Sequence, residues 1–188
     1  GQGRIRLGAE IQNLAQSPVF DLRDRLRPVM KEISVATSET VDLAILDGRR
    51  MRFVDQIIGS QRLRTVSGIG ETFPLTRTAN GKAALACLDE KAAEDLILAE
   101  LADNSGFDIQ LGPLLAEITE IRQGALARDE DEHTPGVSAL GFAVAGRNGD
   151  VFAISVPAPT SRFISIFQTL EEVMQAARRA FLDQEREE

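Results

Sequence analysis

Two strand–turn–strand segments constrain the fold of this chain more than any other feature of its sequence. In residues 41–58 the pair Asp47-Gly48 separates two apolar runs, and in residues 138–156 an Arg147-Asn-Gly-Asp segment does the same. Asp-Gly and Asn-Gly pairs favour the tight turns that join antiparallel strands. The sequence therefore predicts two β-hairpins. The expected strands are 41–46, 51–58, 138–145 and 151–156, with a further short strand over 62–67.

Most of the remaining sequence carries apolar residues at helical spacing. Ser17 is placed to cap a helix with Pro18 in its first turn, and apolar residues recur every three or four positions from there to Ala36. Asp89 is placed to cap another helix. The expected helices are 8–16, 17–36, 79–88, 89–102, 113–123 and 164–184. Hairpins combined with long helices indicate one α/β (α+β) domain over residues 1–188, with an antiparallel sheet and with the N- and C-terminal helices packed together.

The charge and composition exclude several classes of function. The chain has 188 residues and a formal net charge of -8, the opposite of what a duplex-binding surface needs. It contains no run of about 18 apolar residues, so we expect no membrane span and no membrane partner. Its first residues lack the apolar core of a signal peptide. Cys87 is the only cysteine, which excludes an intrachain disulfide. A cytoplasmic location is the default expectation.

Two glycine-containing segments have features of phosphate or anion sites. Gly68-Ile69-Gly70 begins like a dinucleotide-binding loop, but the third glycine is missing, so a turn is the better interpretation. At Thr78 a loop meets the start of the expected helix over 79–88. Free backbone N–H groups at a helix start bind anions, so the amides near Ala79 and Asn80 are candidates to hold a carboxylate. Alternatively, Thr78 simply caps the helix.

A cluster of four acids, Asp129 to Glu132, precedes the turn at Pro135-Gly136. Acid clusters are usually solvated, but this one lies between an apolar segment and an expected core strand. We therefore expect at least one of these carboxylates to point inward. The only histidine, His133, either contributes to a metal site with Asp129 or Glu132 or is simply exposed in its loop.

No combination of residues forms a complete catalytic group. Ser155 lies in an expected strand, and its hydroxyl either binds a ligand or satisfies a neighbouring backbone group. No strand–elbow–helix of the hydrolase type surrounds it. Cys87 has the surroundings of a buried helix residue. We therefore assign no catalytic residue, no metal ligand and no cofactor.

Taken in order, several segments resemble the effector-binding domain of IclR-type bacterial transcriptional regulators. The likeness is strongest over Ala125-x3-Asp129-x2-Glu132-x6-Ala139-Leu140-Gly141. The matching segments are Arg6-Leu7-Gly8, 39–44, 53–55, 74–86, 125–141 and 154–163, so the likeness covers almost the whole chain. Each piece is weak alone, but their order and spacing together are specific.

The resemblance implies a GAF-like fold, with a central antiparallel sheet flanked by helices, that binds a small effector, often an organic acid. It also implies that an N-terminal helix-turn-helix domain is absent from this chain, that DNA is contacted only through that domain, and that the protein forms a homodimer or homotetramer. Carried over by position, the effector-binding residues are Thr65, Phe73, Ala79, Asn80, Asp129, Ala139 and Ser155. Of the four clustered acids, Asp129 is thus the one expected to point inward to the ligand, and the other three are expected to be solvated.

The chain departs from the family pattern at three positions. Thr76 stands where members often have histidine, Ala139 where they have cysteine or serine, and Pro157 where they have serine. Each replacement removes a polar group from the expected pocket, which predicts a less polar ligand than a small keto acid. Arg62 or Arg64, on the expected strand over 62–67, is a candidate to supply a cation instead.

Two other hypotheses stay open beside that of an effector-sensing domain. The first is a GAF-type sensor domain of another kind of signalling protein, which would differ in its neighbouring domains. The second is a small hydrolase that uses Asp129, Glu132, His133 or Ser155. It requires a base within hydrogen-bond reach of a nucleophile.

Overall fold

The computed structural model describes residues 18–103, 109–146 and 148–187. These residues contain five helices and six strands. The helices are α2 (Pro18–Thr37), α3 (Ala79–Cys87), α4 (Glu90–Asp103), α5 (Leu111–Arg122) and α6 (Thr160–Glu187). The strands are β1 (Val41–Asp47), β2 (Arg50–Ile57), β3 (Thr72–Phe73), β4 (Ala127–Glu130), β5 (Val137–Ala145) and β6 (Val151–Pro159).

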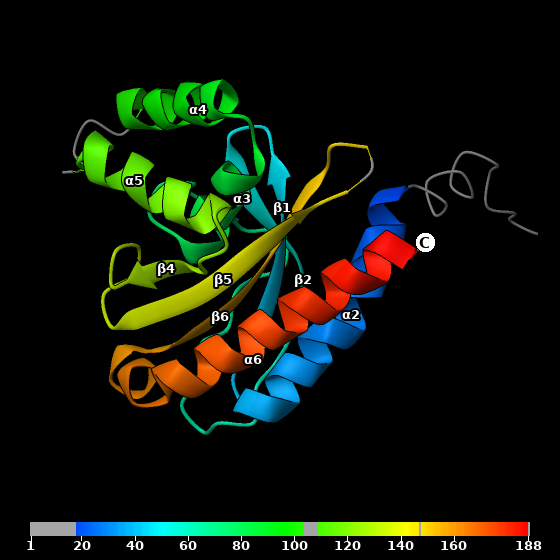
Figure 1. Cartoon of the computed structure of the whole chain (residues 1–188). Coiled ribbons are helices and arrows are strands. Elements are labelled where there is room, and N and C mark those ends of the chain that lie inside the picture. Colours follow the sequence, from blue (N-terminus) through cyan, green and yellow to red (C-terminus); the bar gives the residue numbers. More distant parts are fainter. Residues whose placement is uncertain (1–17, 104–108, 147, 188) are drawn as a thin grey trace, which may run out of the picture.

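The six strands form one antiparallel sheet in the order β3-β2-β1-β6-β5-β4. The two predicted hairpins are β1–β2 and β5–β6, and they meet where β1 pairs with β6. In the first hairpin turn, Gly48 has a φ of +60°, a conformation that favours glycine and explains the Asp-Gly pair. Helices α2 and α6 lie over one face of the sheet, and α3, α4 and α5 lie over the other (Figure 1).

Alternation along the strands divides the core between these two faces. Leu43 in β1 and Ile154 in β6 pack on the side of α2 and α6, whereas the adjacent Ala44 and Ala153 pack on the side of α3. The small side chains allow α3 to lie close to the sheet, and eight of its nine residues are buried. A Cβ atom at Gly81 would lie only 2.4 Å from the carbonyl oxygen of Leu75, so this position of α3 requires glycine.

The sequence-based prediction of an α/β fold with an antiparallel sheet and packed terminal helices is confirmed. Helix α2 begins at Pro18, and α4 follows Asp89, whose Oδ1 accepts a hydrogen bond from the Ala92 N–H at 2.8 Å. The expected helix over 8–16 and the expected cap Ser17 lie outside the described residues. In the described part of the chain, no helix combines the length and apolar character needed to cross a membrane.

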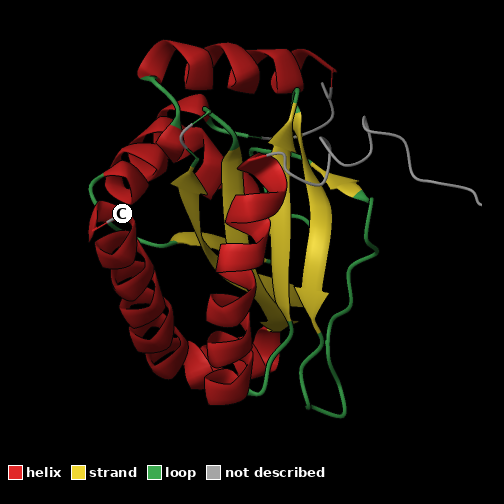
Figure 2. Ribbon diagram, turned by 90° about the vertical axis from the view of Figure 1, so that its right-hand side faces the viewer, coloured by secondary structure: helices red, strands yellow, loops and turns green. Residues whose placement is uncertain are grey.

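The prediction of a strand over 62–67 is wrong. Residues 58–71 form an irregular connection between β2 and β3, seen as a long green loop beside the sheet in Figure 2. This loop is attached through side chains, because Thr65 Oγ1 donates to the Pro157 carbonyl at 2.9 Å and Ser67 Oγ donates to Asp42 Oδ2 at 2.7 Å. Residues 62–67 are therefore not paired with a neighbouring strand through backbone hydrogen bonds. The short edge strands β3 and β4 were not predicted.

Candidate functional site

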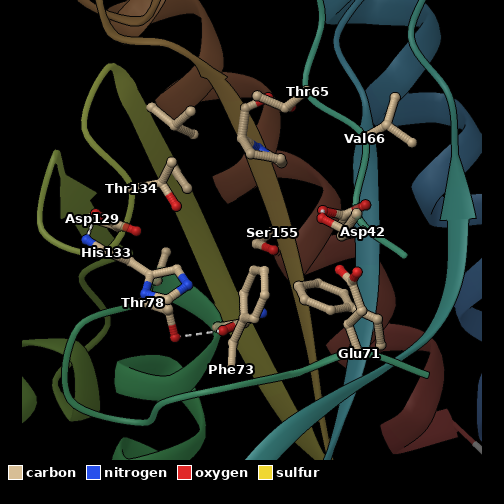
Figure 3. A pocket seen from close by; sticks show the side chains of 17 residues that line it. Asp42, Thr65, Val66, Glu71, Phe73, Thr78, Asp129, His133, Thr134 and Ser155 are labelled. Carbon is tan, nitrogen blue, oxygen red and sulfur yellow. Dashed lines mark hydrogen bonds between the residues drawn. The ribbon is translucent and has the colours of Figure 1, made fainter. Parts of the chain in front are cut away.

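A cavity of about 310 Å³ lies between α3, the sheet and the 58–71 loop. It receives side chains from β1, β2, β4, β5 and β6 and from the loop between β4 and β5 (Figure 3). All seven residues expected to bind an effector line this one cavity: Thr65, Phe73, Ala79, Asn80, Asp129, Ala139 and Ser155. Residues far apart in the sequence are thus brought together by the sheet order, which places β1 beside β6 and β6 beside β5.

The N-terminus of α3 presents two backbone donors to the cavity. The Gly81 N–H donates to Thr78 Oγ1 at 3.1 Å, and the Lys82 N–H makes the first helical bond, to the Thr78 carbonyl at 2.9 Å. Helix geometry leaves the N–H groups of Ala79 and Asn80 without an acceptor inside the helix. Thr78 therefore caps α3, and the N–H groups of Ala79 and Asn80 still remain available to an anion. The two interpretations of this segment, a helix cap and an anion site, are thus compatible.

Asp129 lies on β4, directly opposite Ala139 on β5. Its carboxylate is buried and accepts hydrogen bonds from the backbone N–H groups of Glu132, at 2.9 Å, and His133, at 3.4 Å. Burial is the main cause that raises the pKa of Asp129 to about 6, and the nearby charge of Glu132 adds to this effect. The expected inward orientation of this acid is confirmed.

Asp42 is a second buried acid of the cavity, and sequence reasoning missed it. It lies on β1, is only 1% exposed and accepts hydrogen bonds from Gln56 Nε2, at 2.6 Å, and from Ser67. Burial raises its pKa, and these two hydrogen bonds act in the opposite direction. The one signal in the sequence is an acid within an otherwise apolar strand, since such an acid must face a polar partner or a cavity.

Ser155 lies on β6 opposite Asp42, where the antiparallel register makes the two residues cross-strand partners. Its side chain is buried and lines the cavity. Within the described residues, the Ser155 hydroxyl makes no hydrogen bond. Of the two alternatives for this hydroxyl, the geometry therefore favours a group that is available to a ligand.

An aromatic wall closes another side of the cavity. The Phe53 and Phe73 rings meet edge to face with 4.8 Å between their centroids, and the His133 ring lies 4.6 Å from that of Phe73. Burial lowers the pKa of His133, as do the charges of Arg77 and Arg50. The interpretation of His133 as simply exposed is wrong, because the residue is half-buried and its ring packs against Phe73. Among the described residues, no group of three or more His, Cys, Asp or Glu side chains is arranged to hold a metal ion.

Several other residues singled out in the sequence lie outside the cavity. Thr76 is buried against Glu100, which accepts hydrogen bonds from its backbone N–H and its hydroxyl, so its identity does not change the polarity of the cavity. Arg62 and Arg64 are exposed and supply no cation to it. Glu132 is not simply solvated, because its Oε1 lies 2.7 Å from the buried Lys82 Nζ.

The charged side chains that line the cavity in the described part of the chain are all acidic. Asp42 and Glu71 lie on one side of Figure 3, Asp129 lies on the other, and Ser155 lies between them. The lining residues in the described part of the chain include no lysine or arginine. His133 and Ser155 share the cavity, but no hydrogen bond joins them in the described structure, and Cys87 lies elsewhere. The base and nucleophile that a hydrolase requires are thus not paired.

The sequence was compared with families and with curated proteins. Residues 16–181 match the family described as "Bacterial transcriptional regulator IclR C-terminal". The chain is 42% identical over 165 residues to the HTH-type transcriptional regulator Rv1719 of Mycobacterium tuberculosis, a match that covers 86% of this chain and 63% of that protein. The chain spans less than two thirds of the length of the relatives that it matches first.

Solved structures share the fold. The C-terminal domain assigned to a transcriptional regulator of Vibrio cholerae superposes with a TM-score of 0.71 at 29% identity, covering 84% of this chain and 94% of that one. The effector domain assigned to the transcriptional regulator IclR of Acinetobacter sp. ADP1 gives a TM-score of 0.77 at 16% identity, covering 88% and 98%. The second likeness shows a common fold despite low sequence identity.

Proposed function

Because this chain belongs to the IclR family of bacterial transcriptional regulators, matching its C-terminal part, we propose that it is an effector-sensing domain whose cavity binds a small organic acid. Members of this family are regulators rather than enzymes, which argues against the hydrolase hypothesis and against a sensor from another kind of signalling protein. The fold is the GAF-like effector-domain fold of the family. The cavity, lined by all seven residues expected at the binding site, is the observation that carries the proposal.

The N-terminus of α3 supports the choice of an acid as ligand. The N–H groups of Ala79 and Asn80 and the positive end of the helix dipole are suited to hold one carboxylate. Hydrogen bonds to a charged group contribute about 1.5–3 kcal/mol each. A second carboxylate on the ligand would be repelled by Asp42, Glu71 and Asp129, so the proposal is a monocarboxylic acid whose apolar body lies against the aromatic wall.

The remainder of the proposal concerns the full-length protein. The chain spans less than two thirds of the length of its relatives, and Rv1719 is named an HTH-type regulator. We therefore infer an N-terminal helix-turn-helix domain that alone contacts DNA and whose binding the effector modulates. The net charge of -8 on this chain supports that separation of roles. A homodimer or homotetramer in the cytoplasm completes the proposal.

A thermal-shift titration of the 188-residue chain tests effector binding. Benzoate and 3-phenylpropanoate are compared with the corresponding neutral amides, which lack the charge that α3 would hold. A ligand at 100 times its dissociation constant stabilises the native state by about 2.7 kcal/mol, which raises Tm by about 5–10 °C for a domain of this size. We expect such a shift for the acids and a much smaller one for the amides.

A matched pair of variants assigns any shift to the cavity. Ala139→Asp introduces a carboxylate opposite Asp129, and we expect it to abolish the shift caused by the acids. Ala145→Asp places the same carboxylate at an exposed position at the end of β5, and the shift should persist. No shift with either acid, or an equal shift in Ala139→Asp, would contradict the proposal.

A further inference from the structure

Asp42 and Ser155 form a pair on the floor of the cavity that resemblance to the family does not assign as a pair. They are cross-strand partners on β1 and β6, so their Cβ atoms lie about 4.5–5.5 Å apart on the same face of the sheet. The two residues are 1% and 5% exposed, and both line the cavity. Their polar atoms therefore face the same small volume.

The hydrogen bonds that Asp42 already makes fix its carboxylate without using its full capacity. Oδ1 accepts from Gln56 Nε2, and Oδ2 accepts from Ser67 Oγ. Each carboxylate oxygen can accept two hydrogen bonds, so each retains capacity for one more donor. Ser67 from the loop and Gln56 from β2 therefore fix the orientation of the Asp42 carboxylate before a ligand binds.

Ser155 is the independent observation that points to a ligand. The residue is 5% exposed and lines the cavity, and its hydroxyl makes no hydrogen bond in the part of the chain that the structure describes. The Ser155 oxygen is not one of the fully sealed atoms without a partner, so it opens onto the cavity and can bond a ligand there. The hydrogen bonds that Asp42 accepts within the described structure come from Gln56 and Ser67, and none comes from Ser155.

We propose that Asp42 and Ser155 together recognise a hydroxyl group of the effector, so that the ligand is a hydroxylated aromatic monocarboxylic acid. The ligand hydroxyl donates to the Asp42 carboxylate and accepts from the Ser155 hydroxyl. An ammonium group would donate to Asp42 but could not accept from Ser155. The aromatic ring lies against the wall of Phe53, Phe73 and His133, and the ligand carboxylate lies at α3.

This inference rests on the proposed function, and its test uses pairs of acids that differ only in the hydroxyl. The pairs are benzoate with 4-hydroxybenzoate, and 3-phenylpropanoate with 3-(4-hydroxyphenyl)propanoate. Binding of each acid to the 188-residue chain is measured by calorimetric titration. In at least one pair we expect the hydroxylated acid to bind about tenfold more tightly than its partner, because the unhydroxylated acid gives the Ser155 hydroxyl no partner and adds no donor to the Asp42 carboxylate.

Two variants assign the preference to the pair, each with a matched control. Ser155→Ala and Asp42→Asn should each reduce the preference to less than about threefold. Ser138→Ala removes a buried hydroxyl from the neighbouring strand β5, and Asp47→Asn changes an exposed acid at the end of β1; both should retain it. Ser155→Ala adds no bulk, so it tests the inference even if Asp42→Asn does not fold.

The outcomes separate this inference from the proposed function. Equal affinities within both pairs, or an unchanged preference in Ser155→Ala, would overturn the Asp42–Ser155 inference while binding of the acids would still support effector binding. A preference for a 4-amino analogue over the 4-hydroxy acid would also overturn it. Absence of binding by all four acids would contradict both the inference and the proposed function.

Discussion

At the scale of single residues, Asp129 couples the stability of the chain to pH. Its pKa in the folded chain is about 6, above the ordinary 3.8, so the folded state holds this proton more tightly than the unfolded state. The free energy of unfolding therefore falls as pH rises between about 4 and 6. Relative to wild type, Asp129→Asn should be more stable at pH 7.5 than at pH 4 by about 2 kcal/mol.

Urea unfolding of both proteins at the two pH values measures this difference. Glu130→Gln, at the exposed neighbour on β4, is the control for the loss of one acid from the same strand. The raised pKa would be contradicted if Asp129→Asn differed from wild type by the same free energy at pH 4 and pH 7.5.

Single residues also show where sequence analysis succeeded. The acid cluster between two apolar segments predicted that at least one carboxylate lies near the core, and the resemblance to the family identified that acid as Asp129. Asp42 and His133 were not predictable, because their place in the cavity depends on the pairing of β1 with β6 and on the path of the loop after β4. Those are contacts between distant segments, which no local pattern contains.

At the scale of elements, Lys82 joins α3 to two neighbours. Its side chain is 1% exposed, and its Nζ lies 2.8 Å from Glu117 on α5 and 2.7 Å from Glu132 in the loop after β4. The N–H of that same Glu132 donates to Asp129 in the cavity. Lys82→Met retains the apolar stem and removes the charge. Because both glutamates are partly solvated, we expect a loss of about 1–2 kcal/mol of stability.

The same variant should also weaken binding of carboxylic acids, since Glu132 no longer holds the loop that positions Asp129. Urea unfolding and calorimetric titration measure the two effects. The matched control is Lys91→Met on α4, where the lysine is exposed and paired with Asp95, and there we expect less than about 0.5 kcal/mol. Equal effects of the two substitutions would contradict the structural role of Lys82.

The elements themselves were predictable in proportion to their length. Apolar runs of six or more residues on each side of a Gly-containing turn identified both hairpins, and helical spacing identified α2 and α6. Strands β3 and β4 have two and four residues, too few to show a period. The sequence of residues 62–67 wrongly predicted a strand. The hydroxyl groups of Thr65 and Ser67 attach this segment to the sheet, in place of the backbone hydrogen bonds that a strand would make.

At the scale of the whole molecule, the sheet is the single layer between the cavity and helices α2 and α6. In β1, Asp42 faces the cavity while Val41 and Leu43 pack on the opposite face with Leu26 and Met30 of α2. A ligand held at Asp42 should therefore restrain both β1 and α2. We expect slower amide hydrogen exchange in β1 and α2 when 3-(4-hydroxyphenyl)propanoate is bound.

Helix α4 supplies the internal reference for that measurement, because none of its residues lines the cavity. Exchange in α4 should change little. Protection confined to α3 and the 58–71 loop, with none in α2, would contradict a response that crosses the sheet.

The burial of α3 on nearly all sides has a consequence for how relatives of this chain diverge. A helix of small residues fixed by Gly81 tolerates few substitutions, so the backbone groups proposed to hold a carboxylate are under strong structural constraint. The 58–71 loop is different, because Leu63 and Ile69 are exposed while Thr65, Val66 and Ser67 line the cavity. We therefore expect substitutions in this loop to change ligand preference among relatives. The proposed carboxylate site on α3 and the stability of the domain should change little.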